Sequence, residues 1–132
     1  MVVNKEYLKE NQATADLGVK AIRNDIIRWR AVSLSGNAAE TACFYKFEHN
    51  TGEQVTSDIK FKTNQAEVAI PRDGDPTHFD IKEQYTVYMQ GEVKNKGTEQ
   101  YKLYFYITQY DRSTGKYTPY YFAWDPSLTV SS

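Results

Sequence analysis

Apolar and polar residues alternate through Gln100–Gln109 with the period of two that a β-strand imposes. One face carries Tyr101, Leu103, Phe105 and Ile107, and the other carries Lys102, Tyr104, Tyr106 and Thr108. Because the first face is wholly apolar, we expect it to be buried. The turn sequence Asp111–Lys116 contains Gly115, which accepts a positive φ, and should lead into a return strand, Tyr117–Trp124. The pattern predicts a β-hairpin as the nucleus of the fold, with Tyr120, Phe122 and Trp124 on one face of the return strand.

The rest of the chain shows short strand-like segments separated by turn residues. Strands are predicted at Asp16–Ala21, Ile26–Ser33, Thr41–Glu48, Glu67–Ile70 and Glu83–Val93, with a less regular one from Val55 to Phe61. Asn50–Gly52 is predicted as a hairpin turn, and Lys94–Gly97 as the turn that leads into the central hairpin. Ser35–Asn37 and the proline-flanked Pro71–Pro76 are predicted as loops. Residues 1–15 are polar and aperiodic, which indicates mostly loop. We therefore predict an all-β fold, an antiparallel β-sandwich or jelly-roll-like domain that spans residues 1–132.

Length and charge exclude several classes of protein. The 132 residues fit one domain, and the formal net charge of −1, with basic residues spread along the chain, gives no footprint for nucleic acid. No segment resembles a signal peptide or is long and apolar enough to insert into a membrane, so we expect a cytoplasmic protein. Cys43 is the only cysteine and lies between Ala42 and Phe44, which predicts a small buried hydrophobe rather than a nucleophile.

The sequence gives no indication of catalysis. His49 and His78 are the only histidines, and both lie in polar, turn-like contexts that predict solvated loop side chains. Neither a nucleophile elbow, a phosphate-binding glycine loop, a dinucleotide fingerprint nor a zinc-protease helix motif is present. We therefore expect neither an enzyme nor an organic cofactor.

Three carboxylates gather near the proline-flanked loop. Asp73 and Asp75 lie on either side of Gly74, and Asp80 follows five residues later. Ca²⁺ binds six to eight oxygens from loops of this kind, so the three aspartates are a candidate calcium site. The competing interpretation is a plain acidic turn, because the spacing of an EF-hand loop is absent.

Tyrosine is unusually frequent, with 11 residues, several of them in the last third of the chain. If Leu103 and Phe105 face the core, alternation places a row of tyrosines on the opposite face of the sheet. The candidate binding residues of this face are Tyr88, Tyr104, Tyr106 and Tyr110. Such rings offer flat apolar surface and hydroxyl groups to a partner protein or a sugar. The competing interpretation is that cross-strand tyrosines only stabilise the sheet.

Three motifs occur in order along the chain: Ile26–Ser33 with Arg28, Trp29 and Arg30, then Val93–Tyr101, then Tyr121–Val130 with Trp124, Asp125 and Pro126. Together they resemble the bacterial inclusion-body protein family of the AidA and PixA type. The closing motif, aromatic-x-Trp-Asp-Pro-x-aliphatic-x-Val, is the most specific of the three. The resemblance extends over nearly the whole chain from about Asp16 onward.

The resemblance implies an all-β protein of a host-associated Gram-negative bacterium that accumulates in intracellular inclusions. No catalytic residues are defined for the family, so none are carried over. Family members usually have a further N-terminal segment, including an apolar strand, ahead of the position that matches Met1–Val3. Without that strand, its neighbour in the sheet would keep an unpaired edge, which suggests pairing with a second copy.

The sequence therefore predicts a non-enzymatic protein that self-associates into a homo-oligomer through a tyrosine-rich sheet. The alternative is a lectin-like module that uses the same tyrosines to bind a glycan on host or cell surfaces.

Overall fold

The computed structural model describes residues 5–10, 17–33 and 40–131. Over these ranges it contains nine strands, one 3-10 turn and no α-helix, which confirms the predicted all-β class. The elements are η1 (Lys5–Tyr7), β1 (Leu8–Glu10), β2 (Gly18–Ala21), β3 (Ile26–Trp29), β4 (Glu40–Gly52), β5 (Lys60–Arg72), β6 (Asp75–Glu92), β7 (Gly97–Asp111), β8 (Lys116–Trp124) and β9 (Ser127–Val130). No helix in these ranges is long and apolar enough to cross a membrane. The loop predicted at Ser35–Asn37 lies outside the described residues.

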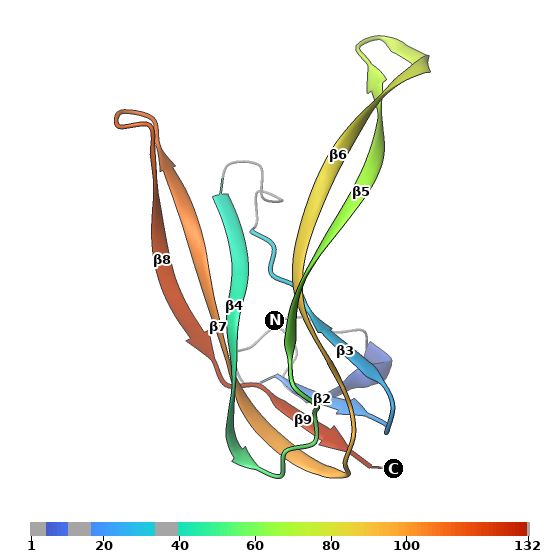
Figure 1. Cartoon of the computed structure of the whole chain (residues 1–132), viewed down its shortest axis with the longest axis vertical. Coiled ribbons are helices and arrows are strands. Elements are labelled where there is room, and N and C mark those ends of the chain that lie inside the picture. The colour runs from blue at the N-terminus through green and yellow to red at the C-terminus, as the bar shows by residue number, and fades with distance from the viewer. Residues whose placement is uncertain (1–4, 11–16, 34–39, 132) are drawn as a thin grey trace.

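The strands form two sheets (Figure 1). Sheet A has the order β1-β2-β9-β7-β4, with β8 also paired to β7, and sheet B has the order β3-β6-β5. Among the described strands, only β2 and β9 pair in parallel. Strands β8 and β9 follow one side of β7 in a single register, since Trp124 pairs with Leu103 and Ser127 with Gln100. Asp125 and Pro126 interrupt this strand at the point where it gains β2 as a second neighbour.

The predicted central hairpin is present as β7 and β8. Leu103 pairs with Trp124 and Phe105 with Phe122, and Gly115 has a φ of 68° in the turn. Tyr101, Leu103 and Phe105 are buried, as the alternation predicts. On β8, however, Tyr120 and Phe122 are about half exposed although they lie on the same face. The hairpin therefore contributes to the core mainly through β7.

Strands β4 to β7 form one long antiparallel ribbon that bends from one sheet into the other. Strand β4 pairs with β7 in sheet A, a bridge between Thr56 and Val93 follows, and β5 pairs with β6 in sheet B. The hairpin turn predicted at Asn50–Gly52 is therefore wrong, because after it the chain crosses between the sheets. Lys94–Gly97 does lead from β6 into β7 of the central hairpin, as predicted. Gly52 and Gly97 do have positive φ angles of 84° and 129°. A local turn signal shows that the chain bends, but not whether it pairs with itself afterwards.

The carboxylate of Glu99 fixes this bend, which we call the corner. The residue is fully buried, and its Oε2 accepts hydrogen bonds from the backbone N–H groups of Val55 at 3.0 Å and Thr56 at 3.2 Å. The Thr56 hydroxyl donates to the same oxygen at 3.0 Å, and His49 Nδ1 lies 3.1 Å from Oε1. A buried carboxylate is tolerated only when such donors replace water. Glu99 on β7 thus binds the crossing segment that follows β4.

The core lies between the two sheets around this corner. Trp29 of sheet B packs against Tyr101 of sheet A with ring centroids 5.2 Å apart, and Phe47 stacks on the same tyrosine at 5.0 Å. Burial, and secondarily the nearby charge of Glu99, raise the pKa of Tyr101 well above its usual value. The other buried apolar residues are Leu17, Val19, Ala21, Ala42, Phe44, Val55, Met89, Val93, Leu103, Phe105, Leu128 and Val130.

The segment Pro71–Pro76 is not the predicted loop. It is the end of a long hairpin in which β5 runs to Arg72, β6 starts at Asp75, and Asp73-Gly74 forms a two-residue turn. Pro71 is tolerated because β5 is an edge strand and the register shifts between Pro71 and Arg72. Pro76 is tolerated because it lies near the start of β6, far from the residues that pair with β3. The strand predicted at Glu67–Ile70 is part of β5, which is continuous over 13 residues.

Two short elements also differ from the predicted pattern. Residues 1–15 were expected to be mostly loop, but Leu8–Glu10 pairs with β2 as an antiparallel strand. The strand expected over Ile26–Ser33 ends at Trp29. Its side chains still alternate, because Trp29 is buried while Arg28 and Arg30 are exposed.

Two arms extend from the core in different directions (Figure 1). One is the β7–β8 hairpin, and the other is the β5–β6 hairpin, whose side chains are almost all exposed beyond Met89. The core therefore holds only the base of each hairpin.

Replacement of Glu99 by Ala should lower the free energy of unfolding by about 3–5 kcal/mol, because three donors of the crossing segment lose a buried acceptor. Glu53 offers a matched control, since it is an exposed glutamate near the same corner, and Glu53→Ala should change the value by at most about 0.5 kcal/mol. Urea unfolding followed by tryptophan fluorescence measures both. Equal effects of the two substitutions would show that Glu99 does not hold the corner.

Gly52→Ala should destabilise the fold more than Gly74→Ala. Both glycines have positive φ, which costs an alanine about 1–2 kcal/mol, but a Cβ on Gly52 would also lie 2.2 Å from the carbonyl oxygen of Thr98. A Cβ on Gly74 meets nothing within 4 Å. Urea midpoints of the two variants give the comparison, and a Gly52→Ala protein as stable as Gly74→Ala contradicts the tight packing at the corner.

Candidate functional site

The outer face of sheet A carries a cluster of tyrosines from three strands. Alternation turns Tyr104, Tyr106 and Tyr110 of β7 outward, and the register places Tyr121 of β8 opposite Tyr106 and Tyr117 opposite Tyr110. A bulge between Phe44 and Lys46 adds Tyr45 of β4 to the same surface. We call this surface the tyrosine face; its members are Tyr45, Tyr104, Tyr106, Tyr110, Tyr117 and Tyr121.

The rings of the tyrosine face contact one another. Tyr45 lies at the centre, with its ring 6.1 Å from Tyr104, 6.0 Å from Tyr106 and 6.1 Å from Tyr121. Tyr110 and Tyr117 form a second pair at 5.0 Å near the hairpin turn. Tyr117 and Tyr121 remain 65% and 66% exposed. The face therefore offers ring surface that is ordered by neighbouring rings and open to solvent.

Charged groups lie at one end of the tyrosine face and engage one another. Lys46 Nζ is 5.0 Å from the ring centroid of Tyr104 and 3.0 Å from Glu48 Oε2, and the Tyr104 hydroxyl donates to the same carboxylate oxygen at 3.2 Å. The hydrogen bond with Lys46 lowers the pKa of Glu48, and the same bond raises the pKa of Lys46. From Lys46 to the hairpin turn, the alternation of β7 and β8 turns no charged side chain onto this face.

Cys43 lies at the border of the tyrosine face and not in the core, where it was predicted. It pairs with Tyr106 across β4 and β7 and is only partly buried. Partial burial raises the pKa of Tyr106, and the neighbouring Cys43 raises it further by a smaller amount. The prediction was wrong because the apolar run from Ala42 to Phe44 alternates, so Ala42 and Phe44 are buried while Cys43 points outward.

The predicted candidate residues do not all come together. Tyr104, Tyr106 and Tyr110 share the tyrosine face, but Tyr88 lies on β6 in sheet B. There its ring lies under the guanidinium of Arg28, 5.3 Å from the centroid, and Arg28 Nε donates to Gln90 at 2.8 Å. Tyr88 was misplaced because alternation gives a side of a strand but not the sheet to which the strand belongs. Tyr45 was missed because it depends on a bulge.

The three aspartates of the candidate calcium site each have a different environment. Asp75 Oδ1 accepts hydrogen bonds from the backbone and hydroxyl of Thr77, which with His78 lower the pKa of Asp75. Asp80 accepts from Arg72 Nε at 3.2 Å, and Asp73 lies in the two-residue turn. In the described part of the chain, no group of three or more His, Cys, Asp or Glu side chains is arranged to hold a metal ion. The geometry therefore favours the plain acidic turn.

The two histidines are exposed, as predicted, but both lie in strands and not in loops. His78 is exposed but lies in β6, 2.5 Å from Asp75 Oδ2. His49 lies in β4 and faces the buried Glu99 of β7. Sequence analysis missed Glu99 entirely, since its donors are more than 40 residues away along the chain. The only local signal was a carboxylate on the core side of an alternating strand.

The motif residues have structural positions. Trp29 belongs to the buried core, and Trp124 is partly buried and packs against it. Pro126 is fully buried, with its carbonyl accepting from the Tyr101 N–H at 3.1 Å. Oδ1 of Asp125 is buried without a hydrogen-bond partner among the described residues.

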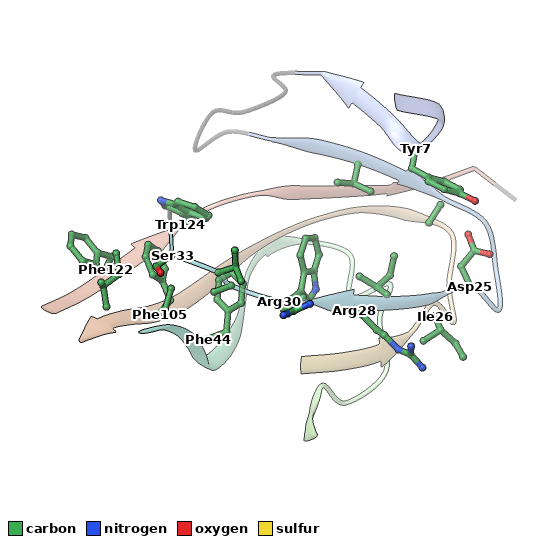
Figure 2. A pocket seen from close by; sticks show the side chains of 18 of the residues that line it. Tyr7, Asp25, Ile26, Arg28, Arg30, Ser33, Phe44, Phe105, Phe122 and Trp124 are labelled. Atoms are coloured by element: carbon green, nitrogen blue, oxygen red, sulfur yellow. The ribbon is translucent and has the colours of Figure 1, made fainter. Parts of the chain in front are cut away.

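A second candidate site is a cavity of about 1060 Å³ on the core side of sheet A, next to β3 (Figure 2). Its wall includes Phe44, Phe105, Phe122 and Trp124, which lie close together in the figure. Ring centroids of Phe105 lie 5.3 Å from Phe122 and 4.7 Å from Trp124. The exposed Arg30 also lines the cavity. This volume lies at the upper end of the range of ligand pockets, about 300–1,000 Å³.

A family model described as PixA, inclusion body protein, matches residues 1–130. No curated protein matches. Among solved structures, the chain resembles an inclusion body protein (PixA) from Burkholderia cenocepacia J2315, with a TM-score of 0.78 and 18% identity over 98% of this chain and 73% of that chain. The solved structure supports the fold, and the family model, which spans almost the whole sequence, shows that this chain belongs to the PixA inclusion body protein family.

Proposed function

We propose that this protein is a non-enzymatic assembly protein of the cytoplasm of a host-associated bacterium, which self-associates through its tyrosine face. The observation that carries the proposal is the cluster of contacting, solvent-exposed rings on β4, β7 and β8. Membership of the inclusion body protein family supports it.

The physical argument rests on the composition of the tyrosine face. Tyrosine gives a large contact area at a small cost in conformational entropy and is enriched at the centre of interfaces. Four of the rings are 41–66% exposed in the isolated chain: Tyr45, Tyr110, Tyr117 and Tyr121. The ion pair of Lys46 and Glu48 stands at the edge of the rings, where a polar rim is expected. Two copies can therefore bury their rings against each other without burying an unpaired charge.

A glycan is less well served by the same surface. Sugar sites combine a stacking ring with free polar groups at fixed positions, but Lys46, Glu48 and the Tyr104 hydroxyl already bind one another. On the tyrosine face, the lectin-like alternative would therefore depend on the hydroxyl groups of the other tyrosines for its polar contacts.

Tyr121→Lys should weaken self-association by about 30- to 150-fold, the effect of losing a residue that contributes 2–3 kcal/mol at the centre of an interface. The side chain is 66% exposed, so the fold should be unaffected. Ile70→Lys is the control, since it places the same charge at an exposed apolar residue on the outer side of β5. Sedimentation velocity over a concentration series measures the association of all three proteins.

Association of Tyr121→Lys that is as strong as that of the wild type contradicts the proposed function. A glycan array separates the alternative: assembly alone gives no signal, whereas a lectin gives a defined sugar signal that Tyr104→Ala removes without unfolding the protein.

A further inference from the structure

The β5–β6 hairpin beyond Val87 forms an arm with little support from the rest of the described chain. Strand β3 pairs with β6 only from Met89 to Glu92, and β5 is an edge strand. From Thr63 to Tyr85 the arm carries almost entirely exposed side chains. An isolated two-stranded hairpin is marginally stable at best in water. An arm of this length therefore gains stability when another surface covers it.

One face of the arm is suited to burial. The face that carries the buried Met89 at the base continues along β6 as Tyr85, Ile81 and Phe79, because these residues lie an even number of positions away. They are 61%, 59% and 54% exposed. We call this row the apolar face of the arm. Most of the arm extends beyond the core of its own molecule (Figure 1).

The same face carries a charge that lacks compensation. Glu67 and Glu83 lie directly opposite each other across the two strands, and like charges in this position are destabilising. Tyr85 donates a hydrogen bond to Glu83 at 3.3 Å, and among the described residues neither glutamate forms an ion pair. A partner that covers the apolar face is therefore expected to bring a positive charge.

The cavity on the core side of sheet A offers both properties. Its aromatic wall, formed by Phe44, Phe105, Phe122 and Trp124, matches the apolar row of the arm in chemistry. Arg30, which directly follows β3, also lines the cavity, is exposed, and can neutralise the carboxylate pair.

We propose that the β5–β6 arm of one copy lies in this cavity of a second copy, and that the second copy returns the same contact, which gives an interlocked dimer. The proposal rests on the proposed function in that the chain associates with itself, but it uses a surface separate from the tyrosine face. Each interface is self-complementary, so either one alone closes at a dimer. Two such interfaces on one chain link dimers into open-ended assemblies.

Ile81→Lys and Ile70→Lys test the arm. The two isoleucines lie on adjacent rungs of the same hairpin, are 59% and 45% exposed, and point to opposite faces. Only Ile81→Lys should remove the interlocked dimer. In sedimentation velocity we expect wild-type protein and Ile70→Lys to form large species. Tyr121→Lys and Ile81→Lys should each stop at dimers. The variant that combines Tyr121→Lys with Ile81→Lys should be a monomer. Circular dichroism confirms that each variant is folded.

The outcomes separate the two proposals. If Ile81→Lys assembles like Ile70→Lys in both the wild-type and the Tyr121→Lys background, the arm is not an interface, whatever the tyrosine variants do. If Tyr121→Lys has no effect but Ile81→Lys converts dimer to monomer, the arm contact stands and the tyrosine face is wrong.

A charge exchange tests the cavity as the occupied site. Arg30→Glu should weaken the Tyr121→Lys dimer at least 10-fold, and adding Glu67→Lys and Glu83→Lys should restore it. Loss without restoration would place the arm elsewhere and overturn the cavity assignment. A dimer that Arg30→Glu leaves unchanged would do the same.

Discussion

The buried carboxylate of Glu99 is the interaction on which the arrangement of this protein depends. A long ribbon of four strands passes from one sheet to the other at the corner, and there the backbone of Val55 and Thr56 turns its N–H groups away from any strand partner and toward Glu99. Buried backbone donors require acceptors, and a carboxylate forms stronger hydrogen bonds than a carbonyl. The two sheets face each other because this bend is fixed, and Trp29 and Tyr101 can then pack across the core.

The corner also explains why the chain presents so much apolar surface. It holds the sheets together at the base of the two hairpins, while their far ends extend in different directions (Figure 1). The β7–β8 hairpin turns its tyrosines outward, and the β5–β6 hairpin leaves Phe79, Ile81 and Tyr85 exposed. A chain with these surfaces is suited to association with further copies, which agrees with its membership of the inclusion body protein family.

Sequence patterns predicted the features that depend on neighbouring residues. Alternation identified the buried side of β7, and the three motifs identified the family. Features set by distant contacts were not predictable. The glycines at 52 and 97 indicate a bend, but only the pairing of distant strands shows that the chain changes sheets there. For the same reason Tyr88 was placed on the wrong sheet, and Glu99 and His49, 50 residues apart, were not recognised as partners.

Amide hydrogen exchange at Val55 and Thr56 tests the central role of Glu99 most directly. If the carboxylate holds the corner, both amides exchange only on global unfolding in the native protein, as slowly as the amides of Leu103 and Phe105 in β7. Exchange at Val55 and Thr56 as fast as that of the exposed turn residue Gly74 would show that the corner opens independently of the core, and would contradict the account.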